Sequence, residues 1–222
     1  MIIFLGMAPI AWHSKKQGSI ESSSFGSELS AMKTAVEMIE GLRYKLRMMG
    51  IPLDGKTFVK ADNMSVIHNC SNPASQLKKK SNSIAYHYIR ERCAAGVCGI
   101  TYIPTQDNLV DICTEVSMLA AFSAAPRQGH LAAVLHLYGY LKKNPKSKLV
   151  FDPTPMDHDC HEEPDWRDFY GEAKELIPPD APEPRGKAVQ TTAFVDSDHA
   201  GDLVNRRSRT GVIIFLGMAP IA

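Results

Sequence analysis

The chain has 222 residues, enough for one large or two small domains with a buried core. Its 25 basic and 24 acidic residues nearly cancel, so the net charge does not indicate a nucleic-acid or membrane partner, and no apolar run approaches the length of a membrane span. The five cysteines are odd in number and contain no Cys-x-x-Cys pair, which argues against a disulfide framework and predicts an intracellular protein, cytoplasmic or nuclear.

The first predicted element is a short apolar run, Ile2–Leu5, which Gly6 closes and which has the composition of a buried strand. It belongs to a ten-residue segment, IIFLGMAPIA, that occurs at Ile2–Ala11 and again at Ile213–Ala222. When Thr191–Ala222 is read first and the chain is continued from Trp12, one continuous domain of ordinary length results. We therefore interpret the chain as a circular permutation whose original beginning now lies at its end.

The elements predicted next in the chain are a strand, a long helix, a second strand and a short helix. Helical spacing of apolar residues from Leu29 to Met49 marks the long helix, which serines cap at its start and Gly50 ends. A basic loop, a further helix and a strand follow. In chain order these elements and the loop are Ala11–Gln17, the long helix from its caps at Ser22–Ser24 to Met49, Thr57–Ala61, Met64–Asn69, Lys78–Lys80, Ser83–Ala94 and Gly99–Ile103.

The second half of the chain has three predicted parts. A short helix capped by Asp107 or Asn108 is followed by a helical region that ends at Lys143, and we expect the apolar stripe of this region, from Leu131 to Leu141, to pack. A Pro-rich acidic stretch then predicts an extended linker with one helical turn group near Trp166–Leu176. Two final strands, at residues 191–195 and 212–216, complete the chain.

Four acidic residues lie at the ends of these elements. Asp196 and Asp62 each follow a strand, Glu28 lies in the first turns of the long helix, and Asp111 starts a helix. If the two strands are parallel neighbours, both aspartates emerge at the edge where α/β sheets place their ligands. Four hard oxygen donors without a cysteine or histidine cluster favour Mg²⁺ or Mn²⁺ and predict two-metal cleavage of a phosphodiester.

Each acid taken singly also has a structural interpretation. Asp before Asn at a strand end is typical of a turn, and Glu in a first helical turn is favoured by the helix dipole. The metal-site hypothesis therefore depends on all four acids occurring together in the rejoined order.

Several segments closely resemble the ribonuclease H domain of copia-type retrotransposon polyproteins, in the family's order apart from the permutation. The segment Val116–Asp152 resembles the carboxyl end of the reverse transcriptase in the same polyproteins. The nuclease-like segments are FVDSDHAGD, RRSRTGVIIFLGMAPIAW, SKKQ, ESSSFGSELSAMK, ADNMSVI, KKKSNSIAYHYIRE and YIPTQDNLVDICT.

This resemblance implies Mg²⁺-dependent hydrolysis of the RNA strand of RNA–DNA hybrids, leaving a 3′-hydroxyl and a 5′-phosphate. It matches Asp196, Glu28, Asp62 and Asp111 to the four family carboxylates, and Asp198 to a further acid near the site. The chain has no Tyr-x-Asp-Asp motif, so we expect no polymerase activity. It also lacks, before the last helix, the histidine that some ribonucleases H carry there.

Basic residues form three clusters in loops around the proposed acidic edge. A nuclease for a hybrid needs such contacts to phosphates, whereas a short basic run is otherwise a solvated loop. The residues predicted to bind nucleic acid are Lys15, Lys16, Lys78, Lys79, Lys80, Arg206, Arg207 and Arg209.

The fold class that we predict is α/β, a permuted ribonuclease H-like mixed five-stranded sheet with flanking helices. The predicted parts are a nuclease-like body (1–115), a reverse transcriptase remnant (116–150), a linker (151–190) and a strand hairpin that completes the sheet (191–222). The duplicated strand predicts a homo-oligomer formed by strand exchange. The alternative to an enzyme is an inactive retroelement remnant or a self-associating structural protein.

Overall fold

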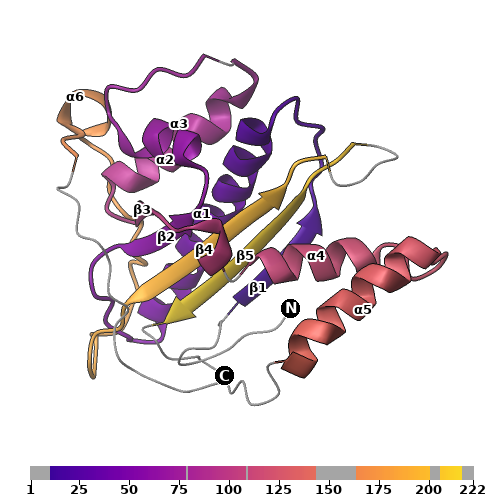
Figure 1. Cartoon of the computed structure of the whole chain (residues 1–222). Helices are drawn as coiled ribbons and strands as arrows, with labels where there is room; N and C mark the ends of the chain where they lie inside the picture. Colours follow the sequence, from indigo (N-terminus) through magenta and orange to yellow (C-terminus); the bar gives the residue numbers. More distant parts are fainter. Residues whose placement is uncertain (1–10, 79, 109, 144–163, 201–205, 217–222) are drawn as a thin grey trace.

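The protein is described here from a computed structural model of the whole chain, shown in Figure 1. The described residues are 11–78, 80–108, 110–143, 164–200 and 206–216. The predicted strand Ile2–Leu5, Lys79 and the first part of the predicted linker lie outside them. None of the helices in the described ranges is long and apolar enough to cross a membrane.

The centre of the molecule is a mixed five-stranded sheet with the strand order β1-β5-β4-β2-β3, which confirms the predicted α/β architecture. Strand β2 is parallel to β3 and to β4, whereas β5 is antiparallel to β4 and to β1. The last two strands of the chain therefore occupy the middle of the sheet. The strands are β1 (Ala11–Lys16), β2 (Thr57–Ala61), β3 (Cys98–Tyr102), β4 (Thr191–Asp198) and β5 (Arg209–Leu216).

Burial along the strands follows from their places in the sheet. Strand β2 alternates buried and half-buried positions, while the first five residues of the central strand β4 are all buried. A strand covered on both faces has no solvent side, which is why Thr191–Val195 is mostly apolar and does not alternate with charged residues.

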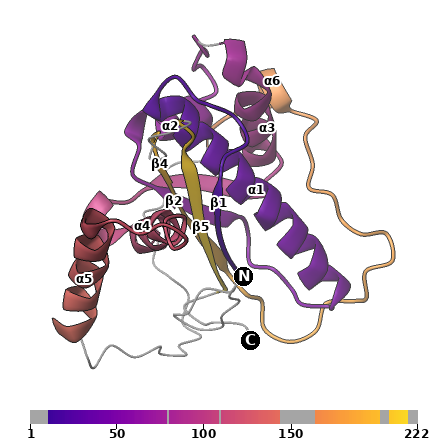
Figure 2. The ribbon, with the colours of Figure 1, turned by 90° about the vertical axis from the view of Figure 1, so that its right-hand side faces the viewer.

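Helices cover both faces of the sheet. Helices α1 (Ser24–Met48), α2 (Met64–Ser71) and α3 (Ser83–Ala94) pack together on one face, and α4 (Asp111–Ala120) lies on the other (Figure 2). The larger core lies on the α1 face, where Leu29, Val36 and Ile39 are fully buried. A smaller core lies on the α4 face. It contains Val110 together with one residue that directly follows β3, one from β4 and one from β5.

The long helix begins and ends as its sequence predicts. The hydroxyl of Ser23 accepts a hydrogen bond from the backbone N–H of Gly26, which caps the first turn. Gly50 follows the last turn with a φ of 69°, a conformation that favours glycine. The predicted apolar face is too long by one residue, because Met49 is 70% exposed.

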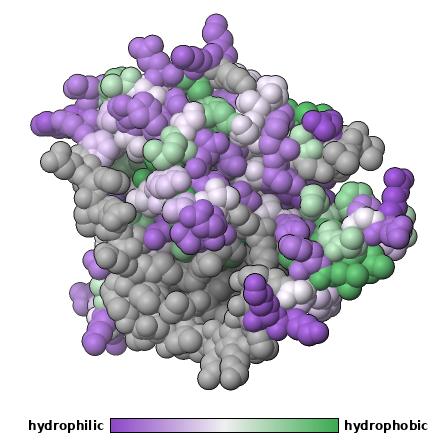
Figure 3. All heavy atoms as spheres, in the orientation of Figure 1, coloured by the Kyte–Doolittle hydropathy of each residue, from purple (hydrophilic) through white to green (hydrophobic). Residues whose placement is uncertain are grey.

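The region resembling the reverse transcriptase forms a helical hairpin beside the sheet. Helix α4 runs through residue 115, where we predicted a domain boundary, and is followed by α5 (Gln128–Lys143). The expected packing of its apolar stripe is wrong, since Leu131, Leu135 and Tyr138 are 57%, 61% and 65% exposed. Apolar atoms accordingly gather over this hairpin at the right of Figure 3.

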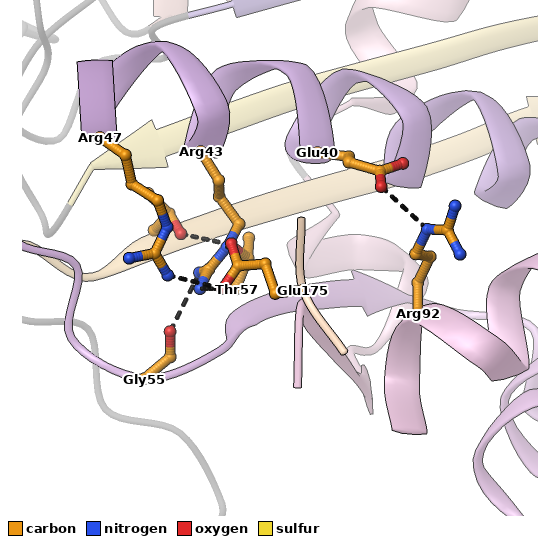
Figure 4. A network of polar contacts seen from close by, with 8 residues as sticks. Glu40, Arg43, Arg47, Gly55, Thr57, Arg92 and Glu175 are labelled. Atoms are coloured by element: carbon orange, nitrogen blue, oxygen red, sulfur yellow. Dashed lines mark hydrogen bonds and ion pairs between the residues drawn. The ribbon is translucent and has the colours of Figure 1, made fainter. Parts of the chain in front are cut away.

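The described part of the predicted linker, residues 164–190, lies against the domain. Its one short helix, α6 (Arg167–Tyr170), is the predicted helical turn group. Further along, Glu175 accepts hydrogen bonds from Arg43 and Arg47 of α1 (Figure 4). The backbone N–H of Val189 donates to the carbonyl of Pro52. This segment therefore leads the chain along α3 and α1 to the start of β4.

Candidate metal centre at the edge of the sheet

Three of the four predicted acids meet at one edge of the sheet. Asp196 lies near the end of β4, Asp62 directly follows β2, and these strands are parallel neighbours. Glu28 comes from the beginning of α1, which packs on β4. One carboxylate oxygen from each lies within 4.8 Å of the others, as expected for residues that share a metal ion.

A buried glutamine fixes the start of α1 against the sheet. The side-chain amide of Gln17, just after β1, donates to the carbonyl of Ser27 at 2.9 Å and to the hydroxyl of Thr210 at 2.9 Å. It also lies 3.3 Å from the hydroxyl of Ser197. These contacts join β1, β4, β5 and α1 beside Glu28, so the position of that carboxylate is set by the fold.

Two threonine hydroxyls donate hydrogen bonds to the carboxylates. Thr114 of α4 donates to Asp196 Oδ2 at 2.7 Å, and Thr105 donates to Asp62 Oδ2 at 2.8 Å. The fourth predicted acid, Asp111, is the first residue of α4, one turn before Thr114. Its side chain lies outside the described part of the structure, so the fourth ligand stays a prediction.

The local environment of Asp196 disfavours its charged form. Burial raises the pKa of this carboxyl group above its ordinary value, and the nearby charge of Asp62 raises it further. The bonds from the Thr114 hydroxyl and the Ser197 N–H lower the pKa but do not offset burial. A bound cation would reverse this balance, and an all-carboxylate set suits Mg²⁺ or Mn²⁺.

The acid next along β4 has a different role. Asp198 accepts a hydrogen bond from the backbone N–H of Arg209 on the neighbouring strand β5. Asp198 and Asp196 also line a depression of about 250 Å³ together with Thr114, Glu115 and Met118. The contact with Arg209 indicates that Asp198 helps to join the ends of β4 and β5, beside the three acids.

The predicted basic residues lie at the same end of the sheet. Lys15 pairs with Thr210 and Lys16 with Arg209, in the part of β5 that faces the end of β4. Arg206 is exposed and Arg207 is half-buried. Arg209 differs, because it is only 9% exposed and its guanidinium donates to Ser117, so it is less available to a ligand.

The third basic cluster is placed by a close contact with α1. Lys78 and Lys80 are exposed, and Lys80 begins a short 3-10 turn that ends at Asn82. A Cβ added to Gly26 would lie 3.0 Å from the side-chain amide of Asn82, so this turn approaches the first turn of α1. The basic loop therefore lies beside the start of α1, the helix that also carries Glu28.

The sequence analysis missed four polar residues around the acids. Gln17, Thr105 and Thr114 hold parts of the site as described above, and His199 places Nδ1 3.3 Å from the hydroxyl of Ser27. Only Thr114 had a usable signal, since it lies three residues after a predicted ligand on a helix. The others act through contacts between segments far apart in the chain.

Comparisons with known proteins point to retrotransposons. The chain is 28% identical over 127 residues to the retrovirus-related Pol polyprotein from transposon RE2 of Arabidopsis thaliana, a match that covers 57% of this chain and 9% of that protein. It is 30% identical over 121 residues to the corresponding polyprotein from transposon RE1 of the same plant, covering 54% and 8%. No family model and no solved structure matches the chain.

These similarities support an origin of the chain in a retrotransposon Pol polyprotein. The chain spans less than a tenth of the length of the curated relatives it matches. The polyprotein names do not specify which activity this part carries, so the activity has to be argued from the acidic edge itself.

Proposed function

We propose that this chain is a retroelement-derived nuclease of the ribonuclease H type, which hydrolyses the RNA strand of RNA–DNA hybrids. The observation that carries the proposal is the meeting of Glu28, Asp62 and Asp196 within 4.8 Å. These acids come from segments far apart in the chain and converge at the carboxyl ends of two parallel strands. Such an edge is where open α/β sheets place their ligands.

The sheet supports circular permutation as part of this proposal. The pair β4 and β5 comes last in the chain yet lies between β1 and β2. Rejoining β5 to β1 through one copy of the duplicated segment would give three consecutive antiparallel strands followed by α1 and β2. That order, a meander followed by strand–helix alternation, is the ribonuclease H-like order that the resemblance implies.

The carboxylates would bind the metal ions, and the threonine hydroxyls that donate to them would hold them in position. Glu28, Asp62 and Asp196, with Asp111 as the predicted fourth ligand, would hold Mg²⁺ or Mn²⁺. The metal would supply Lewis-acid stabilisation of the charge that develops on the phosphate oxygens. The hydroxyls of Thr114 and Thr105 fix the orientation of Asp196 and Asp62 before substrate binds, which reduces the reorganisation needed for reaction.

The basic residues around the edge would position the hybrid. Lys15, Lys78, Lys80 and Arg206 are exposed, whereas the predicted partner Lys79 lies outside the described residues. Phosphate contacts of this kind are not sequence-specific, so duplex shape would decide which substrate binds. Cleavage should therefore weaken steeply as salt concentration rises.

The test is cleavage of an end-labelled RNA–DNA hybrid by the purified full-length chain. We expect cleavage of the RNA strand with Mg²⁺ or Mn²⁺, none with chelator, and none of a DNA duplex of the same sequence. A primed template should not be extended, because the sequence lacks a polymerase motif. A properly folded chain that leaves the hybrid intact with either metal would instead identify it as a non-catalytic retroelement derivative.

A further inference from the structure

The helical hairpin beside the sheet carries an open apolar groove. The groove has a volume of about 510 Å³ and is lined by Val116, Leu119 and Phe122 on one side and by Leu131, Val134 and Tyr138 on the other. Contiguous apolar surfaces of this kind mark binding sites in soluble proteins. The charged edge of the proposed nuclease site does not contribute to the groove, which therefore needs a different ligand.

We propose that the groove binds the surplus copy of the duplicated segment, residues Ile2–Leu5 of the same chain. The second copy already has its place, because Ile213 and Ile214 are buried within β5 at the centre of the sheet. The first copy has the same sequence, but that place in the sheet is filled. Its four consecutive large apolar side chains match a groove lined by apolar residues.

The position of the surplus copy in the chain allows this contact. The segment leads directly into β1, which begins at Ala11, and α4 packs against both β1 and β5. Phe4 lies seven residues before Ala11, and seven residue steps of extended chain span about 23 Å. One wall of the groove is formed by residues of α4, the helix that packs against β1, so the groove lies beside the strand into which the segment leads.

Charge distinguishes this ligand from the other nearby segment of the chain. Residues 144–163, which follow α5, contain seven acidic or basic side chains, whereas residues 2–11 contain none. Burial of an unpaired charge in an apolar groove is unfavourable. Of these two segments, the amino-terminal copy is therefore the one whose chemistry fits the groove.

Docking would also protect the chain from association. An exposed copy of a strand-forming apolar segment can pair with the sheet edge of another molecule. When the segment lies in the groove, the same side chains are buried and are not available for pairing with another molecule. The groove thus gives the hairpin a role that does not depend on catalysis.

The experiment is site-specific photo-crosslinking in the full-length chain. A benzophenone amino acid replaces Phe4, and a control protein carries it at Ile84, which is 79% exposed on α3. The sample mixes unlabelled and ¹⁵N-labelled chains, and mass spectrometry identifies the cross-linked peptides. We expect the probe at position 4 to react with α4 and α5 within one chain, and the control probe not to do so.

Two substitutions on α5 distinguish docking in the groove from nonspecific hydrophobic association. Leu131→Asp places a charge in the groove and should remove the cross-link, whereas Leu135→Asp, one turn further on, should keep it. Both leucines are more than half exposed, so neither change should unfold the helix, and circular dichroism verifies this. Cross-links between differently labelled chains at β1 or β5, or cross-links to the hairpin that survive Leu131→Asp, would overturn the proposal.

Discussion

Carboxylates at the two ends of the parallel strands β2 and β4 lie in opposite electrostatic environments. At the carboxyl ends, three acids gather within 4.8 Å, and the pKa of Asp196 is raised by burial and by the neighbouring negative charge. At the amino ends, Glu175 lies between Arg43 and Arg47 of α1. Burial raises the pKa of Glu175 as well, but the two arginines more than offset it and the net shift is downward.

This contrast shows that partners, more than burial, decide what each carboxylate does. The protein itself neutralises Glu175, with oxygen–nitrogen distances of 2.7 Å to Arg43 and 2.6 Å to Arg47, so this end of the strands is a structural contact. The acidic end concentrates negative charge instead, and a divalent cation would neutralise it. The same helix, α1, contributes to both ends, with Glu28 near its start and the arginines near its end.

The largest effect on the acidic end is expected from Asp62→Asn. The variant keeps the shape of the side chain but removes one negative charge from the proposed metal site. We expect cleavage of the hybrid to fall by roughly a thousandfold, because a lost metal contact removes several kcal/mol of transition-state stabilisation. Initial rates of RNA cleavage with saturating Mg²⁺ measure the effect.

The same variant should change stability in the opposite direction. Without metal, Asp62→Asn should raise the free energy of unfolding by roughly 1 kcal/mol, because repulsion between the carboxylates is relieved. Mg²⁺ should raise the melting temperature of the parent chain and have little effect on the variant. An unchanged cleavage rate, or equal stabilisation of both proteins by Mg²⁺, would remove Asp62 from the metal site.

At the opposite end, Glu175→Gln should lower the free energy of unfolding by about 2 kcal/mol at pH 7, because hydrogen bonds to charged groups lose about this much. The side chain of Arg43 is 3% exposed and would keep an uncompensated charge. Since folding lowers the pKa of Glu175, its contribution is present above its ordinary value of 4.5 and is lost as the pH falls through the folded-state pKa. Urea unfolding at pH 7 and at pH 3 measures both effects.

A matched control is available in the same segment of the chain. Asp165 and Arg167 also form an ion pair, but their side chains are 59% and 87% exposed. Asp165→Asn should leave stability unchanged within error, because exposed pairs contribute little. A loss from Asp165→Asn as large as that from Glu175→Gln would mean that the whole segment is held cooperatively, and not by the arginine contact.

The sequence predicted the acidic end of the strands far better than the arginine end. Asp62 and Asp196 could be found because each follows an apolar run, and parallel strands bring their carboxyl ends to one edge. Glu175 lies in a Pro-rich stretch whose composition predicts only an extended chain. Its contact with Arg43 joins positions 132 residues apart, and no local pattern specifies such a pair.

The elements themselves followed from periodicity, but their packing did not. Apolar spacing predicted that α1 and α5 would be helices and located their ends to within a few residues, because a helical stripe has a fixed period. The same reasoning predicted that the stripe of α5 would be covered, yet Leu131 and Leu135 are exposed. Periodicity identifies an apolar face, while the partner of that face depends on tertiary structure.

A smaller effect is expected from Thr114→Val, which keeps the shape of the side chain and removes the hydroxyl that donates to Asp196. Metal affinity should fall about tenfold, because groups that orient a metal ligand have effects of this size. The carbonyl of Val110 keeps its bond from the Thr114 N–H, so folding should be little changed. Mg²⁺ titrations followed by melting temperature measure the affinity, and an unchanged midpoint would exclude a positioning role.

The smallest effect should come from Thr191→Val, at the opposite end of the same strand. The hydroxyl of Thr191 contacts that of Thr57, which also accepts a hydrogen bond from Arg43. Valine leaves the arginine bond in place, so the free energy of unfolding should fall by about 1 kcal/mol or less. Cleavage and Mg²⁺ affinity should not change, because Thr191 lies at the start of β4 and the proposed ligand Asp196 lies near its end. A fall in Mg²⁺ affinity comparable to that from Thr114→Val would show that the two ends are coupled along β4, and the division between a structural end and a metal-binding end would then be wrong.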